Sequence, residues 1–253
     1  ELSLANGFEV YGLETDENKV RSLQISHPNI KINAPSALKA DVVIIAVPTP
    51  LNDVDKPDFS FVEAACKNVA EHLDNTGRLV VLESTVNPFV SRKIVLPILE
   101  QTGLQVGKDF YLAHCPERID PGNTDWNVSN ISRVIGAISQ EGLEKGVSFY
   151  KKIVKGDIMP LSSVESAEMV KGYENSLRAV NIAFADEMAI VMQNLGLDTK
   201  EIINGVKSKP FGLGLCYPGP GVGGHCIGVD PFYLINESKK RGFDPSFLQK
   251  AMK

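Results

Sequence analysis

Two kinds of hydrophobic pattern divide the chain at about residue 160. Before that point, short continuous apolar runs alternate with segments whose apolar positions recur every three or four residues. The first pattern predicts buried strands and the second predicts amphipathic helices. Strands that alternate with helices in this way are typical of an α/β fold with a doubly wound parallel sheet. After Pro160 only the helical pattern continues.

The first part is expected to hold the strands and the helices of this sheet. Strands are predicted at residues 8–14, 41–47, 78–83, 110–115 and 131–138, and near Ile158. Helices are predicted at residues 16–26, 60–73 and 88–101, and before Ile153. Gly7 is expected to end a further helix that opens the chain. Pro88 stands at a tolerated first position of its helix, whereas Pro97 is expected to kink that helix.

A long helix is predicted to open the second part. Ser162 and Glu165 have the spacing of a capping box. No breaker follows between Gly172 and Gly196, so the helix should run for about 30 residues, a length that suggests a domain connector or a dimer surface. Its apolar stripe consists of Val170, Tyr173, Leu177, Val180, Phe184, Met188, Val191 and Leu195. Shorter helices are predicted at residues 198–205, 232–242 and from 244 onward.

Composition excludes several classes of protein. The chain of 253 residues can form one or two domains. Its net charge of −5 argues against a nucleic-acid surface. No apolar run approaches the roughly 20 residues of a membrane span, and no signal peptide is visible, so a cytoplasmic location is expected. The four cysteines have no C-x-x-C spacing, so neither a metal site nor a disulfide framework is indicated.

A segment rich in glycine and proline, residues 218–232, presents one cysteine. It contains five glycines and three prolines, with Cys226 near its centre and Asp230 four residues later. Glycine lets a ligand approach the backbone, and proline stiffens the loop. A thiol on such a loop is expected to face a ligand, which favours Cys226 as a nucleophile over the ordinary alternative of a buried cysteine.

The same segment contains a misleading match to a nucleotide-binding motif. Gly219, Gly221 and Gly224 fit G-x-G-x-x-G, but that fingerprint needs a strand before it and a helix directly after it. A loop-like run precedes it instead, so we reject the match. Glu14 ends a predicted strand, where an acid commonly bonds the ribose of a dinucleotide about 20 residues after the true fingerprint. We therefore expect the first strand and its glycine-rich loop to be missing ahead of this chain; otherwise Glu14 is an ordinary solvated acid.

The sequence resembles the UDP-glucose/GDP-mannose dehydrogenase family. The resemblance is carried by PGPGVGGHCIGVDPFYL at 218–234, CPER-x-x-PG at 115–122 and KGYEN at 171–175, and it covers essentially the whole chain. The GGHC run is similar to the branch that acts on UDP-N-acetylhexosamines, above all UDP-N-acetyl-D-mannosamine. The resemblance implies a Rossmann-like NAD-binding domain over residues 1–160, truncated at its start. It also implies a helical central domain with the cysteine loop over residues 161–253.

The resemblance further implies a reaction and its residues. Two NAD would oxidise the sugar C6 alcohol to a carboxylate through a thiohemiacetal and a thioester on the cysteine. The implied catalytic residues are Cys226, Lys171, Asn175, Asp230, Glu117 and Thr85. The implied cofactor-binding residues are Glu14, Lys19, Val47, Pro48, Thr49, Ser84 and Thr85. The implied substrate-binding residues are Arg118, Lys171, Asn175, Tyr217, Gly223 and Gly224.

Each catalytic residue has an expected role. Lys171 and Asn175 would stabilise the developing oxyanion, and Lys171 is the candidate cation that favours the thiolate. Asp230 would order the base water with help from Thr85, and Glu117 would activate water for thioester hydrolysis. His225 is given no role. Pro121 stands where glucose-type relatives carry a second glutamate, so that acid has no counterpart here.

Three readings of the function remain open. The first is oxidation of UDP-N-acetyl-D-mannosamine, and the second is oxidation of UDP-N-acetylglucosamine, UDP-N-acetylgalactosamine or UDP-glucose. The third is a truncated, catalytically incomplete binding or dimerisation module, since the resemblance implies a second nucleotide-sugar-binding domain that this chain lacks. The expected partners are the UDP-sugar and a second copy bound through the long helix, with no nucleic acid and no membrane. Glu14 favours NAD over NADP because a carboxylate would repel a 2′-phosphate.

Overall fold

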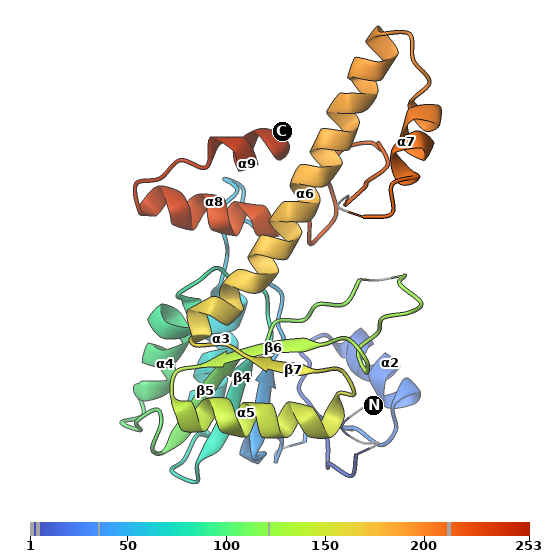
Figure 1. The fold of residues 1–253 in the computed structure, drawn as a ribbon. Coiled ribbons are helices and arrows are strands. Elements are labelled where there is room, and N and C mark those ends of the chain that lie inside the picture. Colours follow the sequence, from blue (N-terminus) through green and yellow to red (C-terminus); the bar gives the residue numbers. More distant parts are fainter. Residues whose placement is uncertain (1–2, 4–5, 35, 121, 212–213) are drawn as a thin grey trace. The chain divides into compact units, whose positions relative to one another are not determined.

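The computed structural model describes residues 3, 6–34, 36–120, 122–211 and 214–253. Strands alternate with helices over most of the chain as far as residue 160, and the described residues after it form helices and loops (Figure 1). The chain divides into two compact units. Unit 1 comprises residues 1–49 and 59–170, and unit 2 comprises residues 50–58 and 171–253.

A five-stranded sheet forms the centre of unit 1. In spatial order its strands are β3 (Val42–Ile45), β4 (Arg78–Leu82), β5 (Phe110–His114), β6 (Arg133–Ala137) and β7 (Ile158–Pro160). Neighbours are parallel except β5 and β6, which are antiparallel. The described residues between these two strands form no helix, and an antiparallel neighbour needs no crossover helix. The predicted α/β class is confirmed, with this pair as the departure from a wholly parallel sheet.

Helices cover both faces of this sheet, as the apolar runs predicted. Side chains alternate along β4: Val80 and Leu82 enter the core formed with α3 (Ser60–Ala70) and α4 (Leu96–Glu100). Leu79 and Val81 enter the opposite core, which includes Tyr150 of α5 (Gln140–Ile153). Because successive side chains of a strand point to opposite faces, a strand buried on both sides is apolar throughout.

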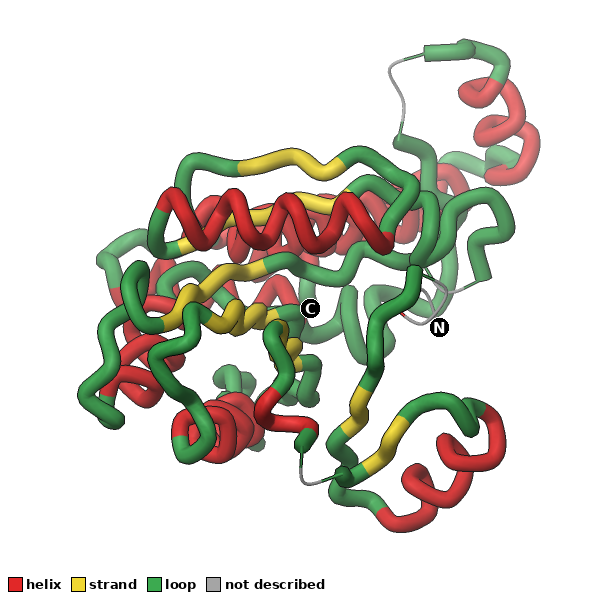
Figure 2. Tube along the Cα trace, turned by 90° about the horizontal axis from the view of Figure 1, so that it is seen from below, coloured by secondary structure: helices red, strands yellow, loops and turns green. Residues whose placement is uncertain are grey.

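The first strands form a separate, smaller sheet (Figure 2). Strand β1 (Tyr11–Gly12) pairs in parallel with β2 (Lys31–Ile32), and α2 (Glu17–Ser26) connects them. Strand β1 is therefore much shorter than the predicted 8–14. The Asp16 carboxylate caps α2 by accepting hydrogen bonds from the first-turn N–H groups. The helix expected to open the chain falls partly outside the described residues, but Gly7 has the left-handed φ of 80° expected at a helix end.

The helix predicted at 88–101 changes type along its length. Ser91–Val95 (η2) has the wider π-helical turn, and α4 follows directly. Pro97 stands in the first turn of α4, where its missing N–H removes one backbone hydrogen bond. Where π-helix occurs at all, it is mostly a single turn within an α-helix, as here. The disturbance lies where Pro97 predicted a kink.

The long helix α6 (Val164–Asn194) has the predicted length, 31 residues, but a different cap. The Ser163 hydroxyl, not that of Ser162, accepts the N–H of Ser166 at 3.1 Å. The capping box was therefore predicted one residue too early, because two adjacent serines satisfy the same local pattern.

A buried carboxylate fixes the start of α6 to η2. Glu168 is fully buried, and its Oε2 accepts the N–H of Phe89 at 2.6 Å while Oε1 accepts the N–H of Ser91 at 2.7 Å. Both donors are backbone N–H groups at a helix start, a position that favours an anion. Phe89 has a left-handed φ of 81°, which is unusual for a bulky residue, and the hydrogen bond to Glu168 helps hold it there. Burial raises the pKa of Glu168 to about 7.

Replacing Glu168 with glutamine should change how stability depends on pH. A carboxyl whose folded-state pKa is raised above its ordinary 4.5 adds most stability below pH 4.5 and loses that contribution as pH rises through about 7. Relative to Glu168→Gln, the unfolding free energy of the parent chain should fall by about 3 kcal/mol across that interval. Urea unfolding at a series of pH values measures this difference.

A matched control lies on the same helix. Glu165 pairs with Arg92 at 2.5 Å, and although burial opposes it, this pairing lowers the pKa of Glu165. Its contribution to stability is present above pH 4.5 and lost as pH falls, so Glu165→Gln should show the opposite trend. Parallel pH curves for the parent chain and Glu168→Gln would contradict the assignment to Glu168.

The rest of unit 2 is built from shorter helices around the second part of α6. These are α7 (Thr199–Lys207), α8 (Asp230–Lys240) and α9 (Ser246–Ala251), close to the predicted ranges. The Asp198 carboxylate caps α7 by accepting the N–H of Glu201 at 2.7 Å. The 50–58 loop belongs to this unit, where the Asn236 side chain donates to the carbonyl of Asp55 at 2.8 Å. In the described part of the chain, none of the helices is long and apolar enough to cross a membrane.

Candidate active site

The cysteine loop of unit 2 presents its thiol and joins it to α8. The side chain of Cys226 is exposed. Its carbonyl accepts the N–H of Val229 at 3.1 Å and that of Asp230 at 2.9 Å, so a helical turn runs from the cysteine to the first residue of α8. A Cβ at Gly228 would lie 2.7 Å from the carbonyl oxygen of Gly224, so only glycine fits there. This turn fixes Cys226 and Asp230 one helical turn apart.

A buried polar pair lies beside this turn. The Asn175 side-chain amide donates a hydrogen bond to Asp230 Oδ2, and each residue is only 4% exposed. Burial raises the pKa of Asp230 to about 6, against the opposing effects of the Asn175 hydrogen bond and the Lys171 charge. Lys171 and Asn175 are four residues apart on α6, so one helix face supplies both groups. The structure thus brings together Lys171, Asn175, Asp230 and the Cys226 backbone.

The other predicted residues of unit 2 lie in the exposed part of the loop. Asp186 of α6 accepts the N–H of Gly219 at 2.6 Å and so fixes the start of the loop. Sequence reasoning missed Asp186, which gave no signal within its helical pattern. The Tyr217 hydroxyl contacts the Lys207 ammonium of α7, and Gly223 and Gly224 are exposed.

In unit 1, two loops are joined at the carboxyl ends of their strands. The buried Ser84 hydroxyl accepts the N–H of Val47 and donates to its carbonyl, each at 2.8 Å. The Thr49 hydroxyl donates to the carbonyl of Thr85 at 2.8 Å, and Pro48 is exposed. Ligands of open α/β sheets bind beyond the carboxyl ends of strands. The predicted cofactor residues that follow β3 and β4 therefore lie together at the expected edge.

Glu14 lies just after β1, where a ribose-binding acid is expected. Its Oε1 accepts the N–H groups of Thr15 and Asp16 at 2.8 and 3.1 Å. Asn33 bonds the Glu14 backbone through both amide atoms, each at 3.0 Å. No donor among the described residues bonds Glu14 Oε2, so this oxygen suits the hydroxyls of an adenosine ribose. Lys19 is exposed in the first turn of α2.

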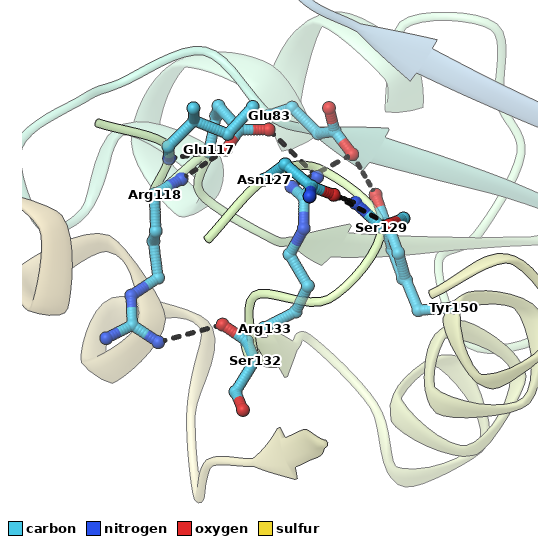
Figure 3. Close-up of polar contacts among 9 residues, drawn as sticks. Glu83, Glu117, Arg118, Asn127, Ser129, Ser132, Arg133 and Tyr150 are labelled. Atoms are coloured by element: carbon cyan, nitrogen blue, oxygen red, sulfur yellow. Dashed lines mark hydrogen bonds and ion pairs between the residues drawn. The ribbon is translucent and has the colours of Figure 1, made fainter. Parts of the chain in front are cut away.

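Glu117 stands in a polar cluster that the sequence did not predict (Figure 3). Its Oε1 accepts the N–H groups of Arg118 and Ile119 at 2.6 and 2.7 Å, and its Oε2 lies 2.8 Å from Arg133 Nη2. Arg133 Nη1 lies 3.9 Å from Glu83 Oε1. The signals available were an acid at the end of one apolar strand and an arginine within another.

Neighbours complete this cluster. The Tyr150 hydroxyl donates to Glu83 Oε1, and Arg118 Nη1 donates to the carbonyl of Ser132 at 3.0 Å (Figure 3). Pro121, where a second acid is absent from the sequence, lies outside the described residues.

Burial determines the charge of several groups in unit 1. It raises the pKa of Glu83, although the Tyr150 hydrogen bond and the Arg133 charge act in the opposite direction. Burial alone would lower the pKa of Arg133, but the carboxylates of Glu117 and Glu83 outweigh it, so that pKa is raised. Burial also raises the pKa of both Cys66 and Cys115 to about 12. These two buried thiols therefore stay protonated, unlike a reactive cysteine.

Comparison with known families matches both parts of the chain. The sequence model for the UDP-glucose/GDP-mannose dehydrogenase family, NAD binding domain, matches residues 29–154. The model for the central domain of the same family matches residues 165–253.

Individual relatives agree with this match. Protein CapL of Staphylococcus aureus is 37% identical over 93% of this chain and 54% of its own length. The UDP-N-acetyl-D-mannosamine dehydrogenase of Pyrococcus horikoshii is 40% identical over 79% of this chain and 47% of its own length. The UDP-N-acetyl-D-glucosamine 6-dehydrogenase of Pseudomonas aeruginosa is 34% identical over 93% of this chain and 55% of its own length. The chain thus spans about half the length of these curated relatives.

Solved structures share the fold. The structure of a UDP-D-ManNAc dehydrogenase from Pyrococcus horikoshii has a TM-score of 0.85 and 33% identity, covering 99% of this chain and 63% of that one. With both domains matched in sequence and the fold matched in structure, the chain belongs to the UDP-glucose/GDP-mannose dehydrogenase family, and NAD is the cofactor of its first domain.

Proposed function

We propose that the protein is an NAD-dependent UDP-sugar 6-dehydrogenase, with UDP-N-acetyl-D-mannosamine as its first candidate substrate. The observation that carries the proposal is the exposed Cys226 joined by one helical turn to the buried Asp230–Asn175 pair. An exposed thiol beside a buried carboxylate and a lysine suits nucleophilic chemistry on a carbonyl. The names of the relatives from Pyrococcus horikoshii and Pseudomonas aeruginosa support a UDP-N-acetylhexosamine as substrate class.

In the first oxidation the C6 alcohol becomes an aldehyde by losing a proton and a hydride. Asp230 orders the water that takes the proton, and the Thr85 hydroxyl helps to hold that water. Lys171 and the Asn175 amide donate to the oxygen as it gains negative charge. When bound by the first domain, NAD would supply the hydride acceptor for both oxidations.

In the second oxidation the cysteine holds the carbon covalently. The Cys226 thiolate adds to the aldehyde carbon, forming a C–S bond, and the oxygen takes a proton to give a thiohemiacetal. Loss of a proton and a hydride gives a thioester. A water activated by Glu117 attacks this thioester, the C–S bond breaks, and the sulfur leaves as the thiolate. One alcohol, one water and two NAD thus give one carboxylate, two NADH and three protons.

The remaining predicted residues bind the ligands. Glu14 binds the adenosine ribose, Lys19 lies near the adenosine or pyrophosphate, and the loops that carry 47–49 and 84–85 take the rest of the cofactor. Arg118, Tyr217, Gly223 and Gly224 contact the substrate. The division into an NAD-binding domain at 1–160 and a central domain at 161–253 is part of this proposal, and the two family matches support it.

The first experiment measures NADH and product for several sugars. UDP-N-acetyl-D-mannosamine, UDP-N-acetylglucosamine, UDP-N-acetylgalactosamine and UDP-glucose are each given to this chain and to the intact gene product. We expect two NADH per molecule of UDP-N-acetyl-D-mannosamine, with the uronic acid identified by mass spectrometry. If another of these sugars gives a higher kcat/KM than UDP-N-acetyl-D-mannosamine, that sugar becomes the proposed substrate. Activity of the intact protein alone would favour the incomplete-module reading for this chain, and no NADH from either would refute the proposal.

We also propose a homodimer through α6. Large apolar side chains remain exposed along its predicted stripe, and exposed apolar patches of this kind commonly mark interfaces. The most exposed members are Tyr173, Leu177, Phe184 and Leu195. Light scattering should give the mass of a dimer for the parent chain and of a monomer for Phe184→Asp. A monomeric parent chain at micromolar concentration would contradict this arrangement.

The reactive thiol of Cys226 also indicates the cellular compartment in which the protein works. Because Cys226 is exposed and is the proposed nucleophile, it needs a compartment that keeps thiols reduced. The cytoplasm is therefore the proposed location.

A further inference from the structure

A buried arginine connects Glu117 to a second carboxylate. Arg133, the first residue of β6, is only 3% exposed. Its Nη2 lies 2.8 Å from Glu117 Oε2, and its Nη1 faces Glu83 Oε1 at 3.9 Å (Figure 3). Burying a guanidinium is unfavourable unless partners compensate it, and the ion pair with Glu117 is such a partner. Glu83 adds a longer-range attraction, since Nη1 and Nε of Arg133 have no hydrogen-bond partner among the described residues.

The second carboxylate is itself held in place. Glu83 follows directly after β4, and the hydroxyl of Tyr150, on α5, donates to its Oε1. Tyr150 is 1% exposed, so its ring cannot move without disturbing the core. Glu83 is therefore a fixed carboxyl group on the Nη1 side of Arg133, within ion-pair distance but beyond hydrogen-bond distance.

The hydrogen bonds that Glu117 makes with the described residues leave one acceptor position open. A carboxylate has about four lone-pair positions, two on each oxygen. The N–H groups of Arg118 and Ile119 occupy both positions on Oε1, and Arg133 occupies one on Oε2. The side chain of Glu117 is 38% exposed, which is compatible with a water molecule at the remaining position on Oε2. By occupying one lone pair of Oε2, Arg133 determines which lone pair of this oxygen is left for solvent.

We propose that Arg133 is a positioning residue for Glu117. It holds Oε2 of Glu117 so that the remaining lone pair of this oxygen receives the proton of the attacking water. Glu83, held by Tyr150, helps to position the guanidinium of Arg133. The inference rests on the proposed function, in which Glu117 activates the water that hydrolyses the thioester. Arginine suits this task because its planar fork reaches two carboxylates at once, whereas lysine donates from a single point.

The test separates thioester hydrolysis from the oxidations that precede it. Arg133→Gln and Arg133→Lys are made in the intact enzyme, and NADH formation is followed in single turnovers. The lifetime of the covalent adduct on Cys226 is followed by intact-protein mass spectrometry. Arg133→Gln should form NADH at nearly the parent rate but lengthen the adduct lifetime by about 100-fold, the lower range of a lost acid–base contribution. Arg133→Lys should lengthen it only about tenfold, because one ammonium can still hold Oε2.

A double-mutant cycle shows whether Arg133 acts through Glu117. If it does, Glu117→Gln combined with Arg133→Gln should be no slower in hydrolysis than Glu117→Gln alone. Arg78→Gln is the matched control. Arg78 is also a buried arginine, 8% exposed, and pairs with Asp74 at 2.5 Å, but it stands at the first residue of β4, the opposite end from Glu83. It should lower thermal stability without lengthening the adduct lifetime.

The outcomes distinguish this inference from the proposed function. An unchanged adduct lifetime in Arg133→Gln, or fully additive effects in the cycle, would overturn the positioning role while Glu117→Gln still accumulated adduct. An unchanged lifetime in Glu117→Gln would instead refute the role of Glu117 on which the inference rests. If Arg133→Gln does not fold, Arg133→Lys decides the question, since the same lifetime as the parent would overturn the proposal.

Discussion

Cys226→Ser should lower the rate of acid formation by about 1,000-fold or more. A serine hydroxyl is far less nucleophilic than a thiolate at neutral pH, so the covalent intermediates of the second oxidation would no longer form. The side chain is exposed, and its backbone turn depends on the carbonyl of residue 226, which serine keeps. The variant should therefore fold like the parent.

The measurement is the yield of NADH and uronic acid per molecule of UDP-sugar in the intact enzyme. Cys216→Ser is the matched control, because Cys216 is a partly exposed free thiol in the same unit and should be dispensable. Full conversion to the acid by Cys226→Ser would rule out the nucleophile assignment. An equal loss in Cys216→Ser would show that any thiol change damages this unit.

Asp230→Asn should reduce turnover by about 100- to 10,000-fold, the range of general acid–base catalysis. An amide cannot take the proton that the water passes on. Folding should not suffer, because burial raises the pKa of Asp230 above its ordinary 3.8 to about 6. The carboxyl group therefore contributes stability in its protonated form, below pH 3.8, and loses that contribution as it ionises with rising pH through about 6. The neutral amide of Asp230→Asn should therefore be no less stable than the parent at pH 7.

The pH dependence of kcat/KM gives a second readout for Asp230. With a pKa of about 6, protonation should make the parent rate fall roughly tenfold per unit as pH drops well below 6. Asp230→Asn should lack this acidic fall. Asp198→Asn, which changes the cap of α7 in the same unit, should keep it. An acidic fall that persists in Asp230→Asn would assign the titration to another group.

Elements with local signals could be predicted from the sequence. The helices predicted at 16–26 and 198–205 agree with α2 and α7, and the apolar run of β4 indicated burial on both faces. The long stripe of α6 gave its length to within a residue or two. In each case the signal lies within the element itself, because capping and amphipathic periodicity are short-range properties.

Features that depend on distant pairings could not be predicted. The antiparallel contact of β5 with β6 is decided by a long connection without a helix, which has no fixed sequence signature. Likewise, Glu83, Glu117, Arg133 and Tyr150 come from separate segments, and only folding brings their charges together. Sequence resemblance predicted a role for Glu117 but not the arginine that holds it. The catalytic roles themselves stay predictions until the variants are measured.

The tight backbone contact at Gly228 limits where this loop can change during evolution. At Gly219 and Gly223 an added methyl group would meet no atom within 4 Å, whereas at Gly228 it would press against the carbonyl oxygen of Gly224. Substitutions that change ligand preference can therefore accumulate in the part of the loop that precedes Cys226. After Cys226, by contrast, a single added carbon at Gly228 would distort the turn that sets the spacing between Cys226 and Asp230. Relatives with altered specificity should therefore keep that turn unchanged.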